Sequence, residues 1–328
     1  MHKIKSSLLS VCAVSFLGIN VVAGGTSQTA SGSGHTLTIG EHNTIENKAR
    51  IVKNAYNTRA FPGYNSQTAR QDLEKGNYKE VFFEDKKAIK PSSRKTLLIL
   101  TATNFETGVI QQEAKRAGLT VQKDMIHDHI VYRLGTLGGV DVVQMQPAMM
   151  GMLEPNSTPL MLMSVFRDLR PDYIIATGIA FGRQAKGHAL GDILVSRQVA
   201  NYETRKESNG NIYFRGDKVT SPMLERINAG IHNWQGAKVH PGLVLSGNVL
   251  VNSKEFLEHI GAREPEYEGG EMEAYGAYAV ASMMGAQWIM IKGISDWGDG
   301  SKNDAFHKVA LENAGQFIFH VIKEGNLK

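Results

Sequence analysis

Cysteine is scarce in this chain of 328 residues, and neither sign of charge is in large excess. Its single cysteine, Cys12, excludes an intramolecular disulfide framework and any metal site made of several cysteines. The chain has 36 Lys+Arg against 32 Asp+Glu, without a long basic run. Because the phosphate backbone of nucleic acid rewards clustered cations, nucleic acid is not an expected partner. We also expect no metal and no cofactor.

Two sequence patterns are missing as well. The Gly-x-Gly-x-x-Gly turn of dinucleotide-binding domains does not follow the first predicted strand, 97–103. A membrane-spanning helix needs about 20 consecutive apolar residues. The apolar run at 8–22 is shorter and is interrupted by Ser15, Gly18 and Asn20. The sequence therefore predicts neither a dinucleotide site nor a stable membrane span.

The N-terminus has the pattern of a targeting segment. Lys3 and Lys5 precede the apolar run, and Ala23 offers a small residue at a cleavage site before a Gly/Ser-rich stretch. We expect residues 1–23 to be a signal peptide and the protein to be exported, either to the periplasm or into the medium. The alternative is an uncleaved N-terminus that anchors the protein in the membrane.

The rest of the chain falls into two parts. Residues 24–94 combine a low-complexity linker at 24–34 with a polar extension, in which local alternation indicates one short β-arch. From 95 to 328, predicted strands and helices alternate. This order predicts an α/β fold with three layers (α/β/α) and a mixed central β-sheet covered on both faces.

Three carboxylates lie at predicted element boundaries near the C-terminus. Glu271 and Glu273 precede the predicted helix 274–284, whose first N–H groups favour ionised carboxylates. Asp296 follows the predicted strand 287–291, and the carboxyl end of a strand is the usual place for a working residue in an open α/β sheet. The structural alternative is that all three side chains merely cap helices.

Several short motifs then occur in one order along the chain. They are EMEA at 271–274, ISD at 294–296, LLILTAT at 97–103 followed by Glu106, YIIATGIAFG at 173–182, DILVSRQVANY at 192–202 and GLVLSGNVLVNS at 242–253. Together they resemble the nucleoside phosphorylase and nucleosidase superfamily, from about residue 95 to 323. Within that superfamily, the chain is most similar to the methylthioadenosine and S-adenosylhomocysteine nucleosidases.

This resemblance implies a purine nucleosidase that needs three chemical roles. Asp296 would protonate N7 of the leaving purine, with Ser295 holding its carboxyl group. Glu273 would accept hydrogen bonds from the ribose hydroxyls. Glu106 would activate the attacking water, and Glu271 would help to order it. A different interpretation of TNFET at 103–107 is a helix N-terminus with a capping threonine and an acidic first turn.

The resemblance also implies the walls of the pocket. Met272 would pack against the sugar. The base would lie between two groups of residues, Ile179, Ala180, Phe181 and Gly182 on one side and Leu250 and Val251 on the other. The similar hydrolases often have phenylalanine where this chain has Leu250, so aromatic stacking worth about 0.5–1.5 kcal/mol would be lost.

The choice between water and phosphate as nucleophile depends on arginines. Phosphorylases of this superfamily commonly have Gly-Asp-x-x-Arg after the first strand and an arginine before the strand-end glycine turn. This chain has TATNFE and Ala176 there, without the fork-shaped donors that suit a phosphate dianion. Hydrolysis is therefore the expected reaction, although Arg183 next to the turn leaves phosphorolysis open.

The expected partner is a small nucleoside, and the resemblance implies a homo-oligomer, a dimer or larger. Two other functions stay open at this point. One is a phosphate-dependent purine nucleoside phosphorylase. The other is a non-catalytic nucleoside-binding or storage protein on the same fold, against which the presence of Glu106, Glu273 and Asp296 together argues.

Overall fold

The computed structural model describes residues 28–32, 35–39, 94–153, 156–208, 211–301 and 304–328. The chain forms two units, Met1–Pro91 and Ser92–Lys328. In the first unit, strands β1 (Gln28–Gly32) and β2 (His35–Ile39) pair antiparallel. β1 lies in the segment predicted as a linker, and β2 lies in the alternating segment predicted as a β-arch. The predicted signal peptide is outside the described residues.

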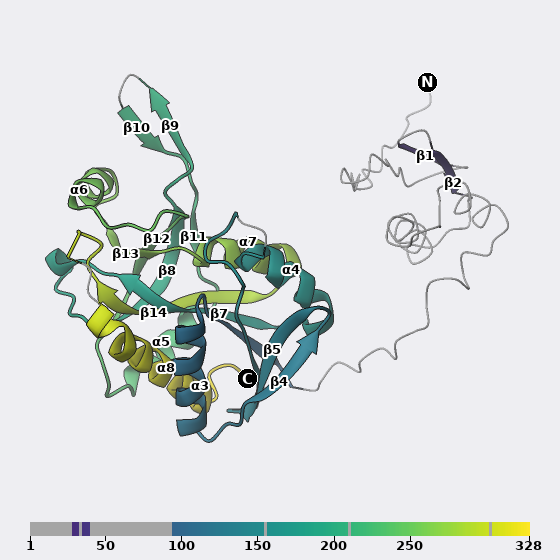
Figure 1. The fold of residues 1–328 in the computed structure, drawn as a ribbon, viewed down its shortest axis with the longest axis horizontal. Helices are drawn as coiled ribbons and strands as arrows, with labels where there is room; N and C mark the ends of the chain where they lie inside the picture. The colour runs from purple at the N-terminus through teal and green to yellow at the C-terminus, as the bar shows by residue number, and fades with distance from the viewer. Residues whose placement is uncertain (1–27, 33–34, 40–93, 154–155, 209–210, 302–303) are drawn as a thin grey trace, which may run out of the picture. The chain divides into compact units, whose positions relative to one another are not determined.

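A ten-stranded mixed sheet runs through the second unit (Figure 1). Its strands are β3 (Thr96–Leu100), β4 (Gln122–Ile126), β5 (His129–Leu137), β6 (Val140–Met145), β7 (Tyr173–Phe181), β8 (Ile193–Asn201), β11 (Lys218–Thr220), β12 (Val239–Ser246), β13 (Tyr267–Glu271) and β14 (Gln287–Asp296). A separate hairpin of β9 (Arg205–Ser208) and β10 (Asn211–Phe214) projects from it.

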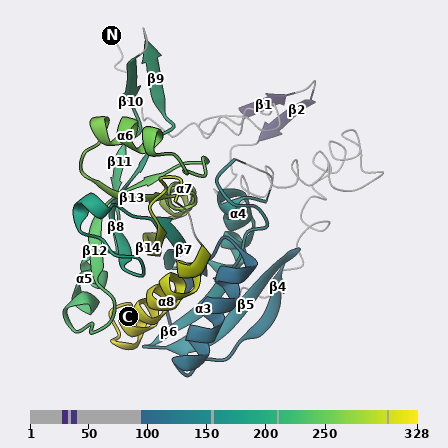
Figure 2. The ribbon, with the colours of Figure 1, turned by 60° about the vertical axis from the view of Figure 1, so that its left-hand side comes forward.

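Helices cover both faces of this sheet (Figure 2). They are α3 (Asn104–Arg116), α4 (Thr158–Leu169), α5 (Leu224–His232), α6 (Lys254–Arg263), α7 (Ala274–Met284) and α8 (His307–Lys323), with short 3₁₀ turns η3 (Gln184–Lys186) and η4 (Asp304–Phe306). α3, α5 and α8 pack on one face, and α4 and α7 pack on the other. The predicted α/β fold with a mixed central sheet is confirmed.

Strand β3 shows why the sequence builds this architecture. Its side chains alternate in direction, so Leu97 and Ile99 pack in the same cluster as Phe317 of α8, whereas Leu98 packs in the other cluster with Leu162 of α4. A strand that is buried on both faces needs an uninterrupted apolar run. The run LLIL meets that need and places the start of α3 directly beneath the carboxyl end of the strand.

One part of the sheet closes on itself. β8 pairs with β12, β12 with β13, β13 with β7, β7 with β14, and β14 again with β8. The parallel pairing of β14 with β7 continues until Asp296 lies beside Phe181. For this reason the strand extends to Asp296, where the sequence predicted an end at 291. The pairing thus fixes Asp296 on the sheet itself.

Gly293 on β14 lies against α8, which allows a direct test of this packing. A Cβ at Gly293 would lie 2.1 Å from the Ala310 carbonyl oxygen. We expect Gly293→Ala to lower the free energy of unfolding by about 1–3 kcal/mol, because the helix must move away from the sheet. Gly108→Ala in α3 is the matched control, since nothing lies within 4 Å of its Cβ. Urea unfolding measures both, and equal midpoints for the two variants would contradict the packing argument.

Candidate active site

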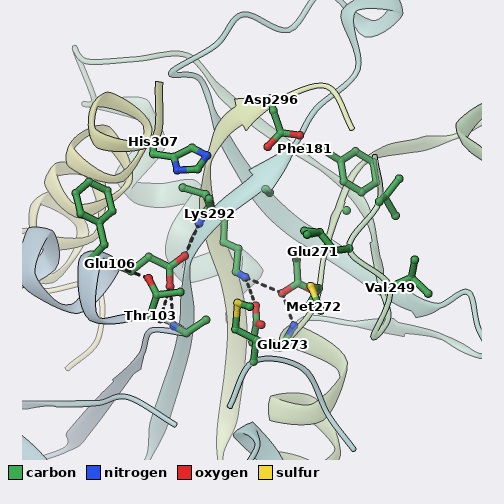
Figure 3. A pocket seen from close by; sticks show the side chains of 18 residues that line it. Thr103, Glu106, Phe181, Val249, Glu271, Met272, Glu273, Lys292, Asp296 and His307 are labelled. Atoms are coloured by element: carbon green, nitrogen blue, oxygen red, sulfur yellow. Dashed lines mark hydrogen bonds and ion pairs between the residues drawn. The ribbon is translucent and has the colours of Figure 1, made fainter. Parts of the chain in front are cut away.

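A cavity of about 390 Å³ opens where β7, β13 and β14 end and where α3 and α8 begin (Figure 3). Polar groups lie on its floor and apolar side chains form most of its walls. Its lining residues are Ala102, Thr103, Phe105, Glu106, Met150, Ile179, Ala180, Phe181, Val249, Leu250, Val251, Gly270, Glu271, Met272, Glu273, Lys292, Asp296 and His307. The three residues to which the sequence analysis gave a chemical role, Glu106, Glu273 and Asp296, therefore line the same cavity.

Glu106 is held by backbone N–H groups from two elements. Its Oε2 accepts from Ala102 N at 2.7 Å and from Thr103 N at 2.9 Å, and its Oε1 accepts from Ile179 N at 3.1 Å. Thr103 in turn accepts from the Glu106 N–H, which completes the capping box of α3. Gly178 permits this close approach of β7, since a Cβ there would lie 2.5 Å from Glu106 Oε1. The capping interpretation is thus confirmed, and the same carboxylate also faces the cavity.

A buried lysine on β14 holds the two other glutamates. The Lys292 ammonium lies 2.5 Å from Glu273 Oε2 and 3.0 Å from Glu271 Oε2, and its side chain is almost completely buried. Figure 3 shows the three side chains pointing toward one another from the cavity floor. The second Glu273 oxygen accepts from Gly151 N at 3.2 Å. Glu273 therefore lies in a fixed orientation with its carboxylate facing a cation.

Glu271 is fully engaged by the protein. In addition to Lys292, its oxygens accept from the N–H groups of Glu273 and Ala274 at 2.8–3.2 Å, at the first turn of α7. These are N–H groups that a helix start leaves unpaired, and a carboxylate there is favoured by the helix dipole. Glu271 thus caps α7 and shares Lys292 with Glu273.

The charges on the floor shift two pKa values. Burial alone would lower the pKa of Lys292, but the fields of Glu271, Glu273 and Glu106 raise it above the ordinary lysine value. Burial raises the pKa of Glu106, Glu273 raises it further, and Lys292 and the backbone N–H groups oppose that rise. The raised pKa of Lys292 favours its ammonium form, and the raised pKa of Glu106 makes it a more basic carboxylate than usual.

Asp296 has a different environment. Ser295 Oγ donates to its Oδ2 at 2.9 Å, and Gly298 N donates to its Oδ1 at 2.8 Å. The side chain is half-buried at the end of β14, and no cation pairs with it among the described residues. The Asp296 carboxyl group therefore lines the cavity with its orientation held by Ser295 and Gly298.

The structure also places the predicted pocket walls. Ile179, Ala180, Phe181, Leu250, Val251 and Met272 line the cavity as predicted. Gly182 and Ser295 do not line it. Gly182 N donates to the Asp296 carbonyl oxygen at 3.0 Å, and a Cβ on Gly182 would meet Ile294 and His188 instead of the cavity. Ser295 is buried behind Asp296. Both residues support the site from outside.

Sequence reasoning missed several lining residues. Lys292 carried a signal, because a lysine in the middle of the core strand QWIMIKGISD must find a buried partner. Phe105, Met150 and Val249 lie on a helix start and in loops and carried none. His307, the first residue of α8, has an Nε2 that lies 3.3 Å from Asp304 Oδ1 but lacks a well-oriented hydrogen bond.

Arg183 is turned away from the cavity. Its guanidinium donates to the carbonyl oxygens of Pro265 and Tyr267 at 2.9 Å and stacks on the Tyr267 ring at 4.1 Å from the centroid. None of the residues that line the described cavity is an arginine. Over the described ranges, His, Cys, Asp and Glu do not gather in a group of three suited to a metal ion. The described helices are also each too short or too polar to span a membrane.

Comparisons with known proteins agree with this geometry. The family described as "Phosphorylase superfamily" matches residues 96–324. The chain is 26% identical over 260 residues to the "Death domain-containing ATP nucleosidase" of Amphimedon queenslandica, covering 68% of this chain and 47% of the relative. It is 28% identical over 205 residues to "ATP nucleosidase Cap17" of Escherichia coli, covering 53% and 40%. It thus spans less than half the length of these two relatives.

Other relatives are covered almost completely. The "5'-methylthioadenosine/S-adenosylhomocysteine nucleosidase" of Actinobacillus succinogenes is 28% identical over 230 residues, which cover 66% of this chain and 96% of that protein. The solved structure of the enzyme of that name from Neisseria meningitidis, in complex with methylthio-immucillin-A, matches with a TM-score of 0.60 and 23% identity, covering 70% and 99%. Futalosine hydrolase of Helicobacter pylori matches at 0.59 and 19%, covering 70% and 98%. These structures share the fold.

Substitution of Lys292 tests the charge pairing on the cavity floor. Lys292→Met leaves the carboxylates of Glu271, Glu273 and Glu106 without their counter-ion, so we expect a loss of about 3–5 kcal/mol in the free energy of unfolding at pH 7.5. Lys292→Arg is the matched control, because it keeps the charge. The deficit of Lys292→Met should shrink at pH 5, since Glu106, whose pKa burial raises, then takes up a proton more readily and leaves less uncompensated charge. Urea unfolding at both pH values measures this, and a wild-type midpoint for Lys292→Met would refute the charge arrangement.

Proposed function

The chain belongs to the phosphorylase superfamily, and we propose that it is a nucleosidase that hydrolyses the N-glycosidic bond of an adenosine-type nucleoside, similar to methylthioadenosine or S-adenosylhomocysteine. One observation carries this proposal: Glu106, Glu273 and Asp296 line a single cavity. Cleavage of that bond leaves positive charge on the ribose and negative charge on the base, through a transition state that resembles an oxocarbenium ion. Each of the three carboxyl groups has a role in such a reaction.

Asp296 is the proposed general acid. It is the one carboxyl group of the three that is not tied to Lys292 or to a capping box, and Ser295 and Gly298 fix its direction. A protonated Asp296 can donate to N7 of a purine lying between Phe181 and the 249–251 segment. The base then leaves as a neutral molecule, which lowers the barrier to bond cleavage.

Glu273 is the proposed ribose clamp. Lys292 Nζ lies 2.5 Å from its Oε2, and an ionised carboxylate can accept hydrogen bonds from two neighbouring hydroxyl groups at once. Gly151 N holds the second oxygen, so the carboxylate does not need to reorient when the sugar binds. The negative charge at this place also favours the positive charge that develops on the ribose.

Glu106 is the proposed base. Three backbone N–H groups fix its orientation, and burial raises its pKa toward the range in which a carboxylate accepts a proton from water. Glu271 has no free role of this kind, because its oxygens are occupied by α7 and Lys292. We therefore assign water activation to Glu106 and assign Glu271 to the support of Lys292.

The nucleophile follows from the charges of the site. A phosphate dianion needs fork-shaped cationic donors. Arg183 binds the backbone of 265–267 and lies outside the cavity lining, and Lys292 is shared among three carboxylates. Both features favour water over phosphate.

The 5′ substituent is the second point to decide. Phe105, Met150, Val249 and Leu250 line the cavity, and all four are exposed to solvent, so they give an apolar surface where a substrate tail would lie. This surface suits a small uncharged tail such as a methylthio group. A nucleoside triphosphate is the second candidate, because two of the relatives are named as ATP nucleosidases.

A nucleoside panel tests the proposal. We expect adenine release from methylthioadenosine and S-adenosylhomocysteine at a rate that does not depend on phosphate, with free sugar as the second product. Product chromatography after incubation with each nucleoside, with ATP, and with or without phosphate separates the functions. Strict phosphate dependence with a sugar 1-phosphate product would indicate a phosphorylase. Binding without any product would indicate a storage protein, and ATP cleavage alone would select the second candidate.

Substitution of the acid and the base should have different kinetic effects. We expect Asp296→Asn to lower kcat at least about a hundredfold, because an amide cannot supply the proton. Glu106→Gln should lower kcat by about 10²–10⁴-fold with little change in KM, since water is not activated but the nucleoside still binds. Asp299→Asn, three residues after Asp296 and outside the cavity lining, is the control and should keep wild-type turnover. Near-normal turnover by folded Asp296→Asn would refute the assignment.

A further inference from the structure

Two histidine rings, His188 buried and His240 half-buried, lie against each other beside the strands that end at the site. The rings of His188 and His240 lie 4.2 Å apart between centroids, tilted by 44°. His188 Nε2 lies 2.9 Å from Glu268 Oε2, and His240 Nε2 lies 2.7 Å from Asp192 Oδ2. Each imidazole therefore has its own carboxylate, and the pair is brought together from the loop before β8, from β12 and from β13.

The backbone fixes the tautomer of His188. Its Nδ1 accepts the N–H of Arg183 at 3.1 Å, so Nδ1 carries a lone pair. The proton of the neutral ring therefore lies on Nε2, where it is donated to Glu268. A second proton would have to go on Nδ1, and the Arg183 N–H would then lose its acceptor and face another N–H group.

This contact is part of the frame around Asp296. Gly182 N donates to the Asp296 carbonyl oxygen at 3.0 Å, one residue before Arg183. From the same loop, Gly191 N donates to the Ile294 carbonyl oxygen at 2.8 Å, and Ile294 N donates to the Asp192 carbonyl oxygen at 2.8 Å. Both ends of segment 182–192 are thus hydrogen-bonded to the end of β14. Within the segment, the hydrogen bond from Arg183 N to His188 Nδ1 links its first residues to its middle.

Titratable and charged groups surround His188 and act on its pKa in opposite directions. Glu268 faces it from β13 and also lies 3.5 Å from Lys186 Nζ, while His240 and Asp192 face it from the other side. The Arg183 guanidinium is turned toward Tyr267. Burial lowers the pKa of His188, and the neighbouring His240 lowers it further, against the opposing effect of Glu268 and Asp192. Two stacked rings 4.2 Å apart cannot both be charged at low cost.

We propose that His188 is a positioning residue for the reaction, in which its neutral ring holds the 182–183 turn and thereby the end of β14 that carries Asp296. Acidification that puts a proton on Nδ1 releases the turn and lowers turnover before the protein unfolds. The kinetic part of this inference rests on the proposed nucleosidase function.

Two isosteric variants separate the two ring nitrogens. His188→Asn places an amide oxygen where Nδ1 was, so it still accepts from Arg183 N but cannot take up a proton. His188→Gln places an amide near Nε2, so it keeps the contact with Glu268 but loses the acceptor. At pH 7.5 we expect His188→Asn to keep kcat within about threefold of wild type. His188→Gln should lose kcat by about tenfold to a hundredfold with little change in KM, because a displaced acid costs chemistry more than binding.

The pH dependence supplies the readout that a merely structural role would not move. Between pH 7.5 and 5, the ratio of kcat for His188→Asn to kcat for wild type should rise, because only the wild-type ring can be protonated. A constant ratio, or equal turnover for His188→Asn and His188→Gln, would overturn the proposal. Both variants are compared at a temperature at which circular dichroism shows them folded.

A measurement without substrate keeps this test independent of the proposed function. The pKa of His188 is lowered on folding, so the unfolded chain binds its proton first as pH falls below the ordinary histidine range. The contribution of His188 to stability is therefore complete above that range and is lost on acidification. Long-range nitrogen NMR of the intact protein should show Nδ1 unprotonated at pH 7.5. A protonated Nδ1 there would refute the positioning role, whereas absence of adenine release alone would refute only the nucleosidase.

Discussion

The pairing of Lys292 with buried carboxylates is the interaction on which the rest of the site depends. An ammonium group in the interior costs several kcal/mol in lost hydration and is tolerated only with well-placed opposite charges. Those charges come from Glu106 on α3, Glu271 at the end of β13 and Glu273 at the start of α7, so segments far apart in the chain must meet. The central strand β14 thus carries a charge that can be buried only when the surrounding elements are in place.

The same interaction explains the shape of the cavity floor. Glu271 can cap α7 and pair with Lys292 at once only because β13 ends beside β7, where Gly270 lies opposite Phe181. The closed circuit of β8, β12, β13, β7 and β14 holds these strand ends together. The position of α7, the register of these strands and the orientation of the carboxylates thus depend on one another. As a result, α7 and Lys292 bind the Glu271 carboxylate, whereas Asp296 faces the cavity.

Local patterns predicted the parts of the fold that depend on nearby residues. The helix at 274–284 was predicted at its exact bounds, because small apolar residues mark it. The end of β14 was predicted too early, since its last residues are ordered by pairing with β7. Lys292 was missed although a lysine within a core strand signals a buried partner, and Phe105 and Met150 were missed because a helix start and a loop bring them to the cavity only after folding.

The balance of charge on the floor connects this arrangement to chemistry. Three carboxylates, Glu106, Glu271 and Glu273, surround one ammonium, so the floor is negative overall when all are ionised. Such a floor lowers the energy of a sugar that gains positive charge and raises the energy of an approaching phosphate dianion. Lys292 compensates part of this charge by pairing with the buried Glu271 and Glu273, and the remaining negative charge would favour an oxocarbenium ion. The negative sign of the field therefore favours the proposed hydrolysis over phosphorolysis.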